Sequence, residues 1–313
     1  SLSLEFQTVS LNKLEIPHSD FNRNSSLEFI SPEALPSHII RSSNKSTLKK
    51  YLFDVNKSLA NHLNVPHPLG RISKRRTPLI CGHRGSLYQE PENTIAGFLN
   101  AYENGVDAVE LDVFLLKCGN LVVFHGAGGD ENPGLLHDNI GIEGSILDYT
   151  AEEARMLLFN SFGSEFGCPW ERLVAPTAFI PTLKEVLEVL KDTGVVAKIE
   201  LKGQGTAEPV LELVESMDMV DQCHYSSFDH SRIARIRELR PERRPDGSHI
   251  YKTGALFVDP PDNFIDMSMA VGASEVHLKY DTCTKERVAS IQANGMGSMA
   301  WWRGPPGMLE DTT

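Results

Sequence analysis

The chain has 313 residues, of which 41% are hydrophobic and 23% are charged, so it can bury a sizeable globular core. Its 42 acidic and 30 basic side chains give a formal net charge of −12, which argues against nucleic acid as a partner. No apolar run approaches the roughly 20 residues of a membrane helix, so we expect no membrane span.

The cysteines and the N-terminus bear on the compartment. Five cysteines are scattered without a CxxC pair, which argues against disulfides or a zinc site. We therefore expect a cytoplasmic protein with reduced thiols. The chain starts without Met and lacks a secretory signal pattern, so a removed targeting segment stays open as an alternative.

Two regions of the chain differ in composition and hydrophobic pattern. Residues 1–76 are rich in Ser and Asn, with one helical pattern at 47–63, and we interpret them as an N-terminal extension of unknown function. From residue 77 to 313, strand-like apolar runs alternate with helical patterns, which indicates parallel βαβ units. About eight such units predict an α/β fold of the TIM-type (β/α)8 barrel class. The predicted strands are 78–82, 108–114, 121–125, 195–201, 224–228, 254–258, 274–280 and 297–302, and the predicted helices are 92–105, 182–194, 207–217, 230–241 and 284–295.

The longest departure from this rhythm is an insertion at about 126–180. It begins with the Gly-rich run GAGGDENPG. An insertion of that size over a barrel mouth usually serves as a lid or a substrate wall.

Polar residues follow the first apolar runs at their C-terminal ends, where parallel α/β folds carry their chemistry. His83 and Arg84 follow one run, and His125 ends LVVFH. Two imidazoles can remove one proton and supply another, the two tasks of phosphodiester cleavage near neutral pH. Arg84 suits a phosphate, with a salt bridge to Glu90 or Glu92 as the structural alternative.

Carboxylates stand on two further strands. Glu110 and Asp112 share one strand face and would repel each other unless something positive neutralised them. Glu200 and Lys202 share a face before a Gly turn. Three carboxylates offer an all-oxygen site for Mg²⁺ or Ca²⁺. The alternatives are a carboxylate that faces an Arg or a helix N-terminus, and a Lys202–Glu200 ion pair without a catalytic part.

These residues belong to an ordered series of motifs over about 78–302. HRG, PENTIAGFLNAYENGVDAVELDVFL, LVVFH, IPTLKEVLEVL, IELKG and YSSFDHSRIARIRELRP follow in an order and spacing that resembles the glycerophosphodiester phosphodiesterases. The resemblance implies a TIM-type barrel with an insertion after the early strands. It also implies metal-dependent hydrolysis of glycerophosphodiesters, such as glycerophosphocholine, to glycerol 3-phosphate and an alcohol.

The resemblance also assigns roles. It implies that His83 and His125 are the catalytic acid and base, and that Arg84 and Lys202 bind the substrate phosphate. The expected metal ligands are Glu110, Asp112 and Glu200. The attacking oxygen is that of water or of the glycerol 2-hydroxyl.

The chain departs from this family in two places. FHG replaces the usual His-Asp and is closer to phosphoinositide-specific phospholipases. After SMAWWRGPPGMLEDTT the chain stops where relatives continue into another strand, so a barrel lacking its last βα unit is expected. The alternative functions are a phosphodiesterase of phospholipase C or sphingomyelinase D type acting on intact lipids, and a non-catalytic barrel module.

Overall fold

The structure is a computed structural model that describes residues 79–87, 89–129, 132–157, 159 and 179–302. Its parallel strands are β1 (Cys81–Gly82), β2 (Ala108–Leu115), β4 (Val196–Leu201), β5 (Cys223–Ser227), β6 (Lys252–Phe257), β7 (Glu275–Lys279) and β8 (Gly297–Trp301), and β3 (Leu121–Val123) is antiparallel to β2. The α-helices are α3 (Ile95–Glu103), α4 (Ala151–Ala154), α5 (Leu183–Leu190), α6 (Ala207–Ser216), α7 (His230–Leu239), α8 (Phe264–Ala270) and α9 (Lys285–Ala293). Short 3₁₀ turns lie at Ile146–Asp148, Val220–Gln222 and Tyr280–Thr282.

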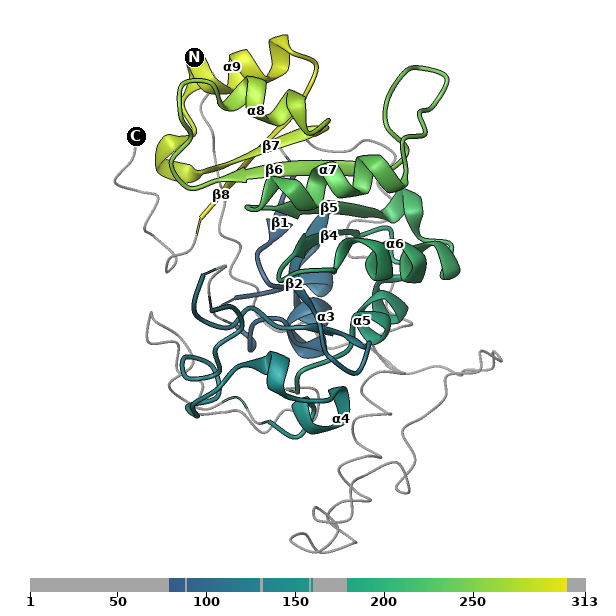
Figure 1. Ribbon diagram of the computed structural model, residues 1–313, viewed down its shortest axis with the longest axis vertical. Helices are drawn as coiled ribbons and strands as arrows, with labels where there is room; N and C mark the ends of the chain where they lie inside the picture. The colour runs from purple at the N-terminus through teal and green to yellow at the C-terminus, as the bar shows by residue number, and fades with distance from the viewer. Residues whose placement is uncertain (1–78, 88, 130–131, 158, 160–178, 303–313) are drawn as a thin grey trace, which may run out of the picture.

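The parallel strands form one curled sheet with helices along its outer side (Figure 1). They follow the order β1-β2-β4-β5-β6-β7-β8, so each strand pairs with the next parallel strand along the chain. Within the described residues, β1 and β8 each pair with one parallel strand only. The predicted barrel is therefore confirmed in an incomplete form, without a last βα unit in the part of the chain that is described.

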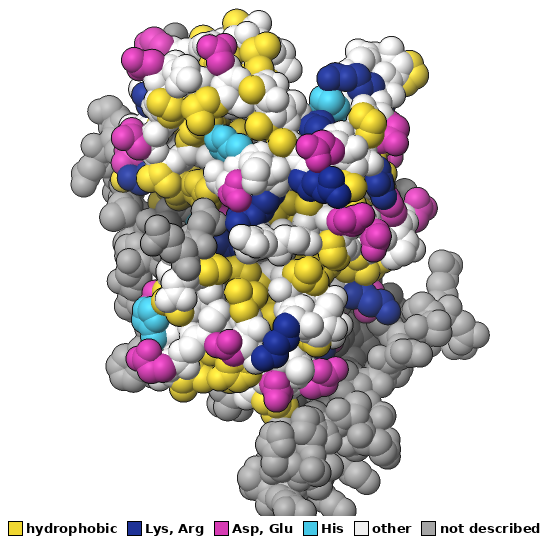
Figure 2. Space-filling model, viewed as in Figure 1, with side chains coloured by type: hydrophobic (Ala, Val, Ile, Leu, Met, Phe, Trp, Pro, Cys, Tyr) yellow, Lys and Arg dark blue, Asp and Glu magenta, His cyan; other side chains and the backbone are white. Residues whose placement is uncertain are grey.

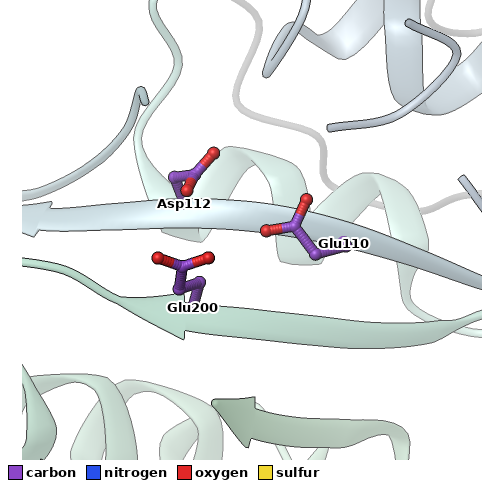
Figure 3. Close-up of side chains that lie close together, drawn as sticks. All are labelled: Glu110, Asp112 and Glu200. Atoms are coloured by element: carbon purple, nitrogen blue, oxygen red, sulfur yellow. The ribbon is translucent and has the colours of Figure 1, made fainter. Parts of the chain in front are cut away.

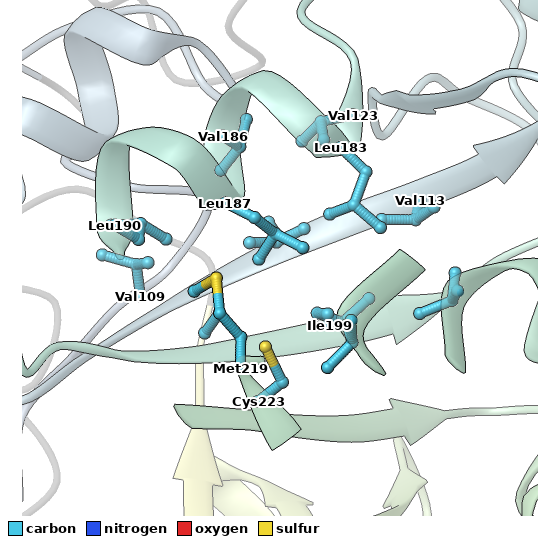
Figure 4. Packing of buried hydrophobic residues seen from close by; sticks show 14 of the residues in the cluster. Val109, Val113, Val123, Leu183, Val186, Leu187, Leu190, Ile199, Met219 and Cys223 are labelled. Atoms are coloured by element: carbon cyan, nitrogen blue, oxygen red, sulfur yellow. The ribbon is translucent and has the colours of Figure 1, made fainter. Parts of the chain in front are cut away.

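Alternating side chains divide each strand between two environments. On β2, Val109, Leu111 and Val113 are fully buried against the helices. Figure 4 shows this packing, in which Leu183, Leu187 and their neighbours on α5 lie over β2. The intervening residues of β2 point into the curl of the sheet, and this face carries the polar site described below.

The pairing direction predicted for one strand was wrong. We expected 121–125 to belong to a parallel unit, but β3 forms a hairpin with β2, in which Val113 lies opposite Val123. Its connection is a tight turn closed by the Leu116 N–H, which donates to the Asn120 carbonyl at 2.9 Å. A parallel pairing would need a crossover of about a dozen residues or more, which this connection is too short to supply.

The described part of the insertion has its own small core. Phe114 and Phe124 pack with Ile146 and Ile180, all of them fully or almost fully buried. This cluster fixes the β2–β3 hairpin to the segment that follows it. The extension predicted at 1–76 lies outside the described residues.

The surface seen in Figure 2 carries acidic and basic side chains interspersed, with hydrophobic side chains between them. No helix among the described residues has the length and apolar character needed to cross a bilayer. Helix α8 was missed in the sequence, because its FIDMSMA segment is short and has no clear helical period.

Candidate active site

The HRG turn connects β1 to the site. Arg84 and Gly85 both have left-handed backbone, with φ of 53° and 93°. A Cβ at Gly85 would lie 2.8 Å from the carbonyl carbon of Gly97, so only glycine lets the turn approach α3 this closely. The turn aims the backbone N–H of Arg84 at Glu110 Oε2, to which it donates at 2.9 Å.

The Arg84 side chain lies below the surface, between two carboxylates. Its Nη1 donates to both oxygens of Glu92 at 3.0 Å, and its Nε lies 3.6 Å from Asp112 Oδ2. Burial alone would lower the pKa of Arg84, but the charges of Glu92, Asp112 and Glu110 raise it above its ordinary value. The salt bridge considered as the structural alternative is therefore present, and it fixes the guanidinium beside the site.

Asn93 is a site residue that the sequence analysis missed. It lies just before α3, but the N-cap of that helix is Thr94, whose side chain accepts the Gly97 N–H. Asn93 is fully buried, and its Nδ2 donates to Asp112 Oδ2 at 2.8 Å while its Oδ1 accepts the Asp112 N–H at 3.2 Å. Its φ of 57° is one that Asn tolerates better than most residues, but no local sequence pattern identifies this backbone conformation or the contact with Asp112.

Three carboxylates meet on the inner face of the sheet. Glu110 and Asp112 project from β2, and Glu200 projects from β4 directly opposite Asp112. All three are buried, and each offers an oxygen within 4.8 Å of the others. Figure 3 shows the Asp112 and Glu200 carboxylates facing each other, with Glu110 further along β2.

Lys202 supplies part of the balancing charge. Its Nζ lies 3.3 Å from Asp112 Oδ1 and 3.6 Å from Glu200 Oε1. Burial would raise the pKa of Asp112, but Lys202, His125 and Arg84, together with the Asn93 hydrogen bond, hold it below its ordinary value. Asp112 is therefore the most firmly ionised of the three carboxylates.

The negative charges of Glu110 and Glu200 are balanced less completely than that of Asp112. The pKa of Glu110 is raised well above its ordinary value, mainly by burial and also by repulsion from Asp112 and Glu200. Burial also raises the pKa of Glu200 to about 7, against the opposing pull of Lys202. Repulsion of this kind is what a bound cation relieves.

The two histidines lie near different carboxylates of the group. His83 Nε2 is 3.7 Å from Glu110 Oε2, and the His83 side chain is 26% exposed. His125 follows β3, where the Phe124 N–H donates to the Asp112 carbonyl at 3.0 Å. The β2–β3 hairpin thus brings His125 within electrostatic reach of Asp112.

The residues present fit a divalent cation. Glu110 Oε1 is buried and has no hydrogen-bond donor among the described residues. The donor set is all oxygen, which suits Mg²⁺ or Ca²⁺ rather than zinc. The seven residues predicted for the site lie on β2 and β4 or shortly after β1, β3 and β4, four strands that neighbour one another in the sheet.

Comparison of the sequence with known protein families identifies the family of this chain. The profile of the glycerophosphoryl diester phosphodiesterase family matches residues 83–302, a span that contains the whole site. The chain belongs to this family. The predicted family and the prediction of a phosphodiesterase are thereby confirmed.

Relatives in this family are similar along most of their length. The glycerophosphodiester phosphodiesterase of Caldanaerobacter subterraneus subsp. tengcongensis is 30% identical over 228 residues, which cover 71% of this chain and 84% of that protein. That of Bacillus altitudinis is 33% identical over 225 residues, covering 69% and 82%. The solved glycerophosphodiester phosphodiesterase of Thermotoga maritima is 25% identical, with a TM-score of 0.55 over 76% of this chain and 91% of that one.

Proposed function

We propose that the chain hydrolyses glycerophosphodiesters, such as glycerophosphocholine, to glycerol 3-phosphate and an alcohol, with Mg²⁺ or Ca²⁺ as its cofactor. The observation that carries this proposal is the gathering of three buried carboxylates, two histidines and two cationic side chains at one end of the sheet. The names of the two curated relatives support the same substrate class. Residues 77–313 would form the catalytic barrel with its insertion at about 126–180, and 1–76 an extension.

In this proposal, Lys202 and Arg84 bind the substrate phosphate. The Lys202 side chain is 20% exposed, so it can meet an incoming phosphate while it stays beside Asp112. Arg84 is held by Glu92 and acts mainly through its fixed positive charge. Because both charges are in place before the substrate arrives, little reorganisation is needed on binding.

Glu110, Asp112 and Glu200 would hold the cation. A bound Mg²⁺ or Ca²⁺ would offset the negative charge that develops on the phosphate and lower the pKa of the attacking oxygen. Asn93 and the Arg84 N–H orient two of the three carboxylates through the hydrogen bonds described above.

His83 and His125 would act as the acid and base. One lies near Glu110 and the other near Asp112, so each imidazole can exchange a proton close to the carboxylate group. In this arrangement one ring removes the proton of the attacking oxygen, and the other protonates the oxygen of the leaving alcohol. The order of the two roles follows from which side of the phosphate the alcohol occupies.

The test is release of glycerol 3-phosphate from glycerophosphocholine by the purified chain, with Mg²⁺, with Ca²⁺ and with a chelator. We expect metal-dependent release that falls at least about a hundredfold in His83→Ala and in Glu110→Gln. Glu238→Gln, which removes an exposed carboxylate on α7, is the matched control and should keep its activity. Release by either site variant near the unmodified level, at matched folding, would refute the proposed site.

A second candidate is a phosphodiesterase that acts on lysophospholipids or intact phospholipids. It is favoured by exposed apolar residues at the ends of β5 and β6, where Phe228 is 38% and Val258 52% exposed. Phe228 also makes an edge-on ring contact with Trp301 of β8, at 5.5 Å between centroids. Hydrolysis of lysophosphatidylcholine faster than glycerophosphocholine would favour this candidate over the first.

A further inference from the structure

A second polar cluster lies on the inner face of the sheet, outside the proposed site. Glu275 of β7 is its centre: Lys198 Nζ donates to Glu275 Oε2 at 2.5 Å, and His277 Nε2 lies 2.9 Å from the same oxygen. His224 Nδ1 of β5 lies 3.2 Å from Glu275 Oε1. These four side chains are at most 18% exposed, so the Glu275 carboxylate is enclosed by nitrogen groups from three strands.

Lys198 does not pair with the carboxylate of the adjacent strand β2. In the pairing of β2 with β4, Lys198 lies directly opposite Glu110, and both side chains point to the inner face. Yet Lys198 pairs with Glu275, which follows it by 77 residues and belongs to a strand beyond β5 and β6. Within the described chain, Glu275 is the one carboxylate with which Lys198 forms an ion pair.

The sheet gives Glu275 the room to reach across. Its neighbours in register are Gly254 on β6 and Gly297 on β8, which have no side chains. A Cβ at Gly254 would lie 2.5 Å from the His277 ring, and one at Gly297 would lie 3.2 Å from Glu275 Cγ. Side chains at either position would displace the cluster, so the glycines allow Glu275 and His277 to extend over the adjacent strands.

The alternative position of Lys198 would affect the metal site. An ammonium group beside Glu110 would neutralise one of the three carboxylates, and it would repel a divalent cation at close range. Glu110 Oε1, buried without a hydrogen-bond donor in the described part of the chain, would accept such a group readily. The three-carboxylate site is therefore available to a cation only if Lys198 pairs with a group other than Glu110.

We propose that Glu275 is a positioning residue that holds Lys198 away from Glu110 and thereby keeps the three-carboxylate site free for a divalent cation. This inference rests on the proposed metal site. Glu275 itself would touch neither substrate nor cation, because it acts through Lys198.

The test measures binding of Mg²⁺ and of Ca²⁺ to the full chain by calorimetry, after treatment with a chelator. In Glu275→Gln the released Lys198 should pair with Glu110 and weaken cation binding by at least about tenfold. Adding Lys198→Met to that variant removes the competing charge and should restore binding to near the unmodified value. Rescue by a second substitution is a result that a purely structural role of Glu275 would not give.

Controls separate the possible failures. Glu275→Asp keeps the charge but shortens the reach, so it should weaken binding less than Glu275→Gln and serves if the latter does not fold. Glu238→Gln, which removes one of the two carboxylate partners of the exposed Arg235 on α7, should leave cation binding unchanged. Unchanged binding in Glu275→Gln, or weakened binding that Lys198→Met does not restore, would overturn the inference. If the unmodified chain binds no cation, or Glu110→Gln binds equally well, the proposed metal site fails as well.

Discussion

Strands β2 and β8 belong to the same parallel sheet but differ in how much of them is buried. Every residue of β2 except the last is buried, whereas β8 has three exposed and two half-buried residues. β2 pairs with β1, β3 and β4, and α5 contributes several buried residues to the core around it. β8 pairs with β7 alone among the described strands, and α9 buries a single residue, Ile291.

This comparison shows that neighbours, more than strand composition, decide the burial of a parallel strand. Parallel strands are ordinarily covered on both faces and paired at both edges. β2 meets that condition and β8 does not. The three carboxylates of the proposed metal site lie on the well-packed side, where rigid strands can hold them in a fixed geometry.

The largest expected effect tests packing on the two sides. Leu111→Ala on β2 removes a fully buried side chain and should lower the free energy of unfolding by about 2–5 kcal/mol. Met299→Ala on β8 removes a half-buried side chain and should cost less than about 1 kcal/mol. Urea unfolding of both variants measures the difference, and equal losses would contradict the comparison.

A smaller effect is expected from loss of the hydrogen bonds that orient Asp112. Asn93→Ala removes both hydrogen bonds that orient Asp112, so we expect glycerophosphodiester hydrolysis to fall about 10–100-fold. Cation affinity should fall with it, while the helix cap at Thr94 keeps α3 in place. Asn100→Ala, at a half-buried position of the same helix where the side chain bonds to Asn104 and not to the site, is the matched control. An Asn93→Ala variant with full activity would show that Asp112 is held by its other partners.

The smallest expected effect is a pH dependence on the β7 side. Burial, opposed by Glu275 and reinforced by Lys198 and His224, lowers the pKa of His277 below its ordinary 6.5. The unfolded chain then binds more protons at this position below pH 6.5, so the contribution of His277 to stability falls as the pH falls. Glu200, with its pKa raised to about 7, contributes in the opposite sense, so the effect of His277 is the difference between the unmodified chain and a His277 variant. The pKa of Glu275 is itself lowered, and its contribution is lost only below about pH 4.5.

The measurement is urea unfolding between pH 7 and pH 5. His277→Asn should lose less stability than the unmodified chain as the pH falls, with His137→Asn, at an exposed position, as the control. Hydrogen exchange should show the loss first in the amides of β7 and β8. Exchange that accelerates first in β2 would contradict the view that the two sides differ in stability.

Much of the architecture could be predicted from the sequence. Apolar runs ending in polar residues located every strand of the sheet to within a few residues, because buried parallel strands leave a continuous apolar pattern. The same pattern could not tell the hairpin strand β3 from a barrel strand, since pairing direction depends on the connection and not on the strand. The site residues on β2 and β4 were predicted because alternate positions of one strand share a face.

Other features depend on contacts that no local pattern contains. The role of Asn93 depends on a left-handed backbone that turns its amide toward a strand 19 residues away. The choice of Arg84 between phosphate and Glu92 had to be left open, because both partners suit a guanidinium. The pairing of Lys198 with Glu275 joins positions 77 residues apart, and only the curl of the sheet brings them together.

That separation also sets an order of events during synthesis. At about 5–20 residues per second, the 77 residues between Lys198 and Glu275 take about 4–15 s to be made. During that interval β2 and β4 already carry all three carboxylates and Lys198, but the residue proposed to hold Lys198 away does not yet exist. The site would therefore reach its proposed cation-binding form only after β7 has joined the sheet.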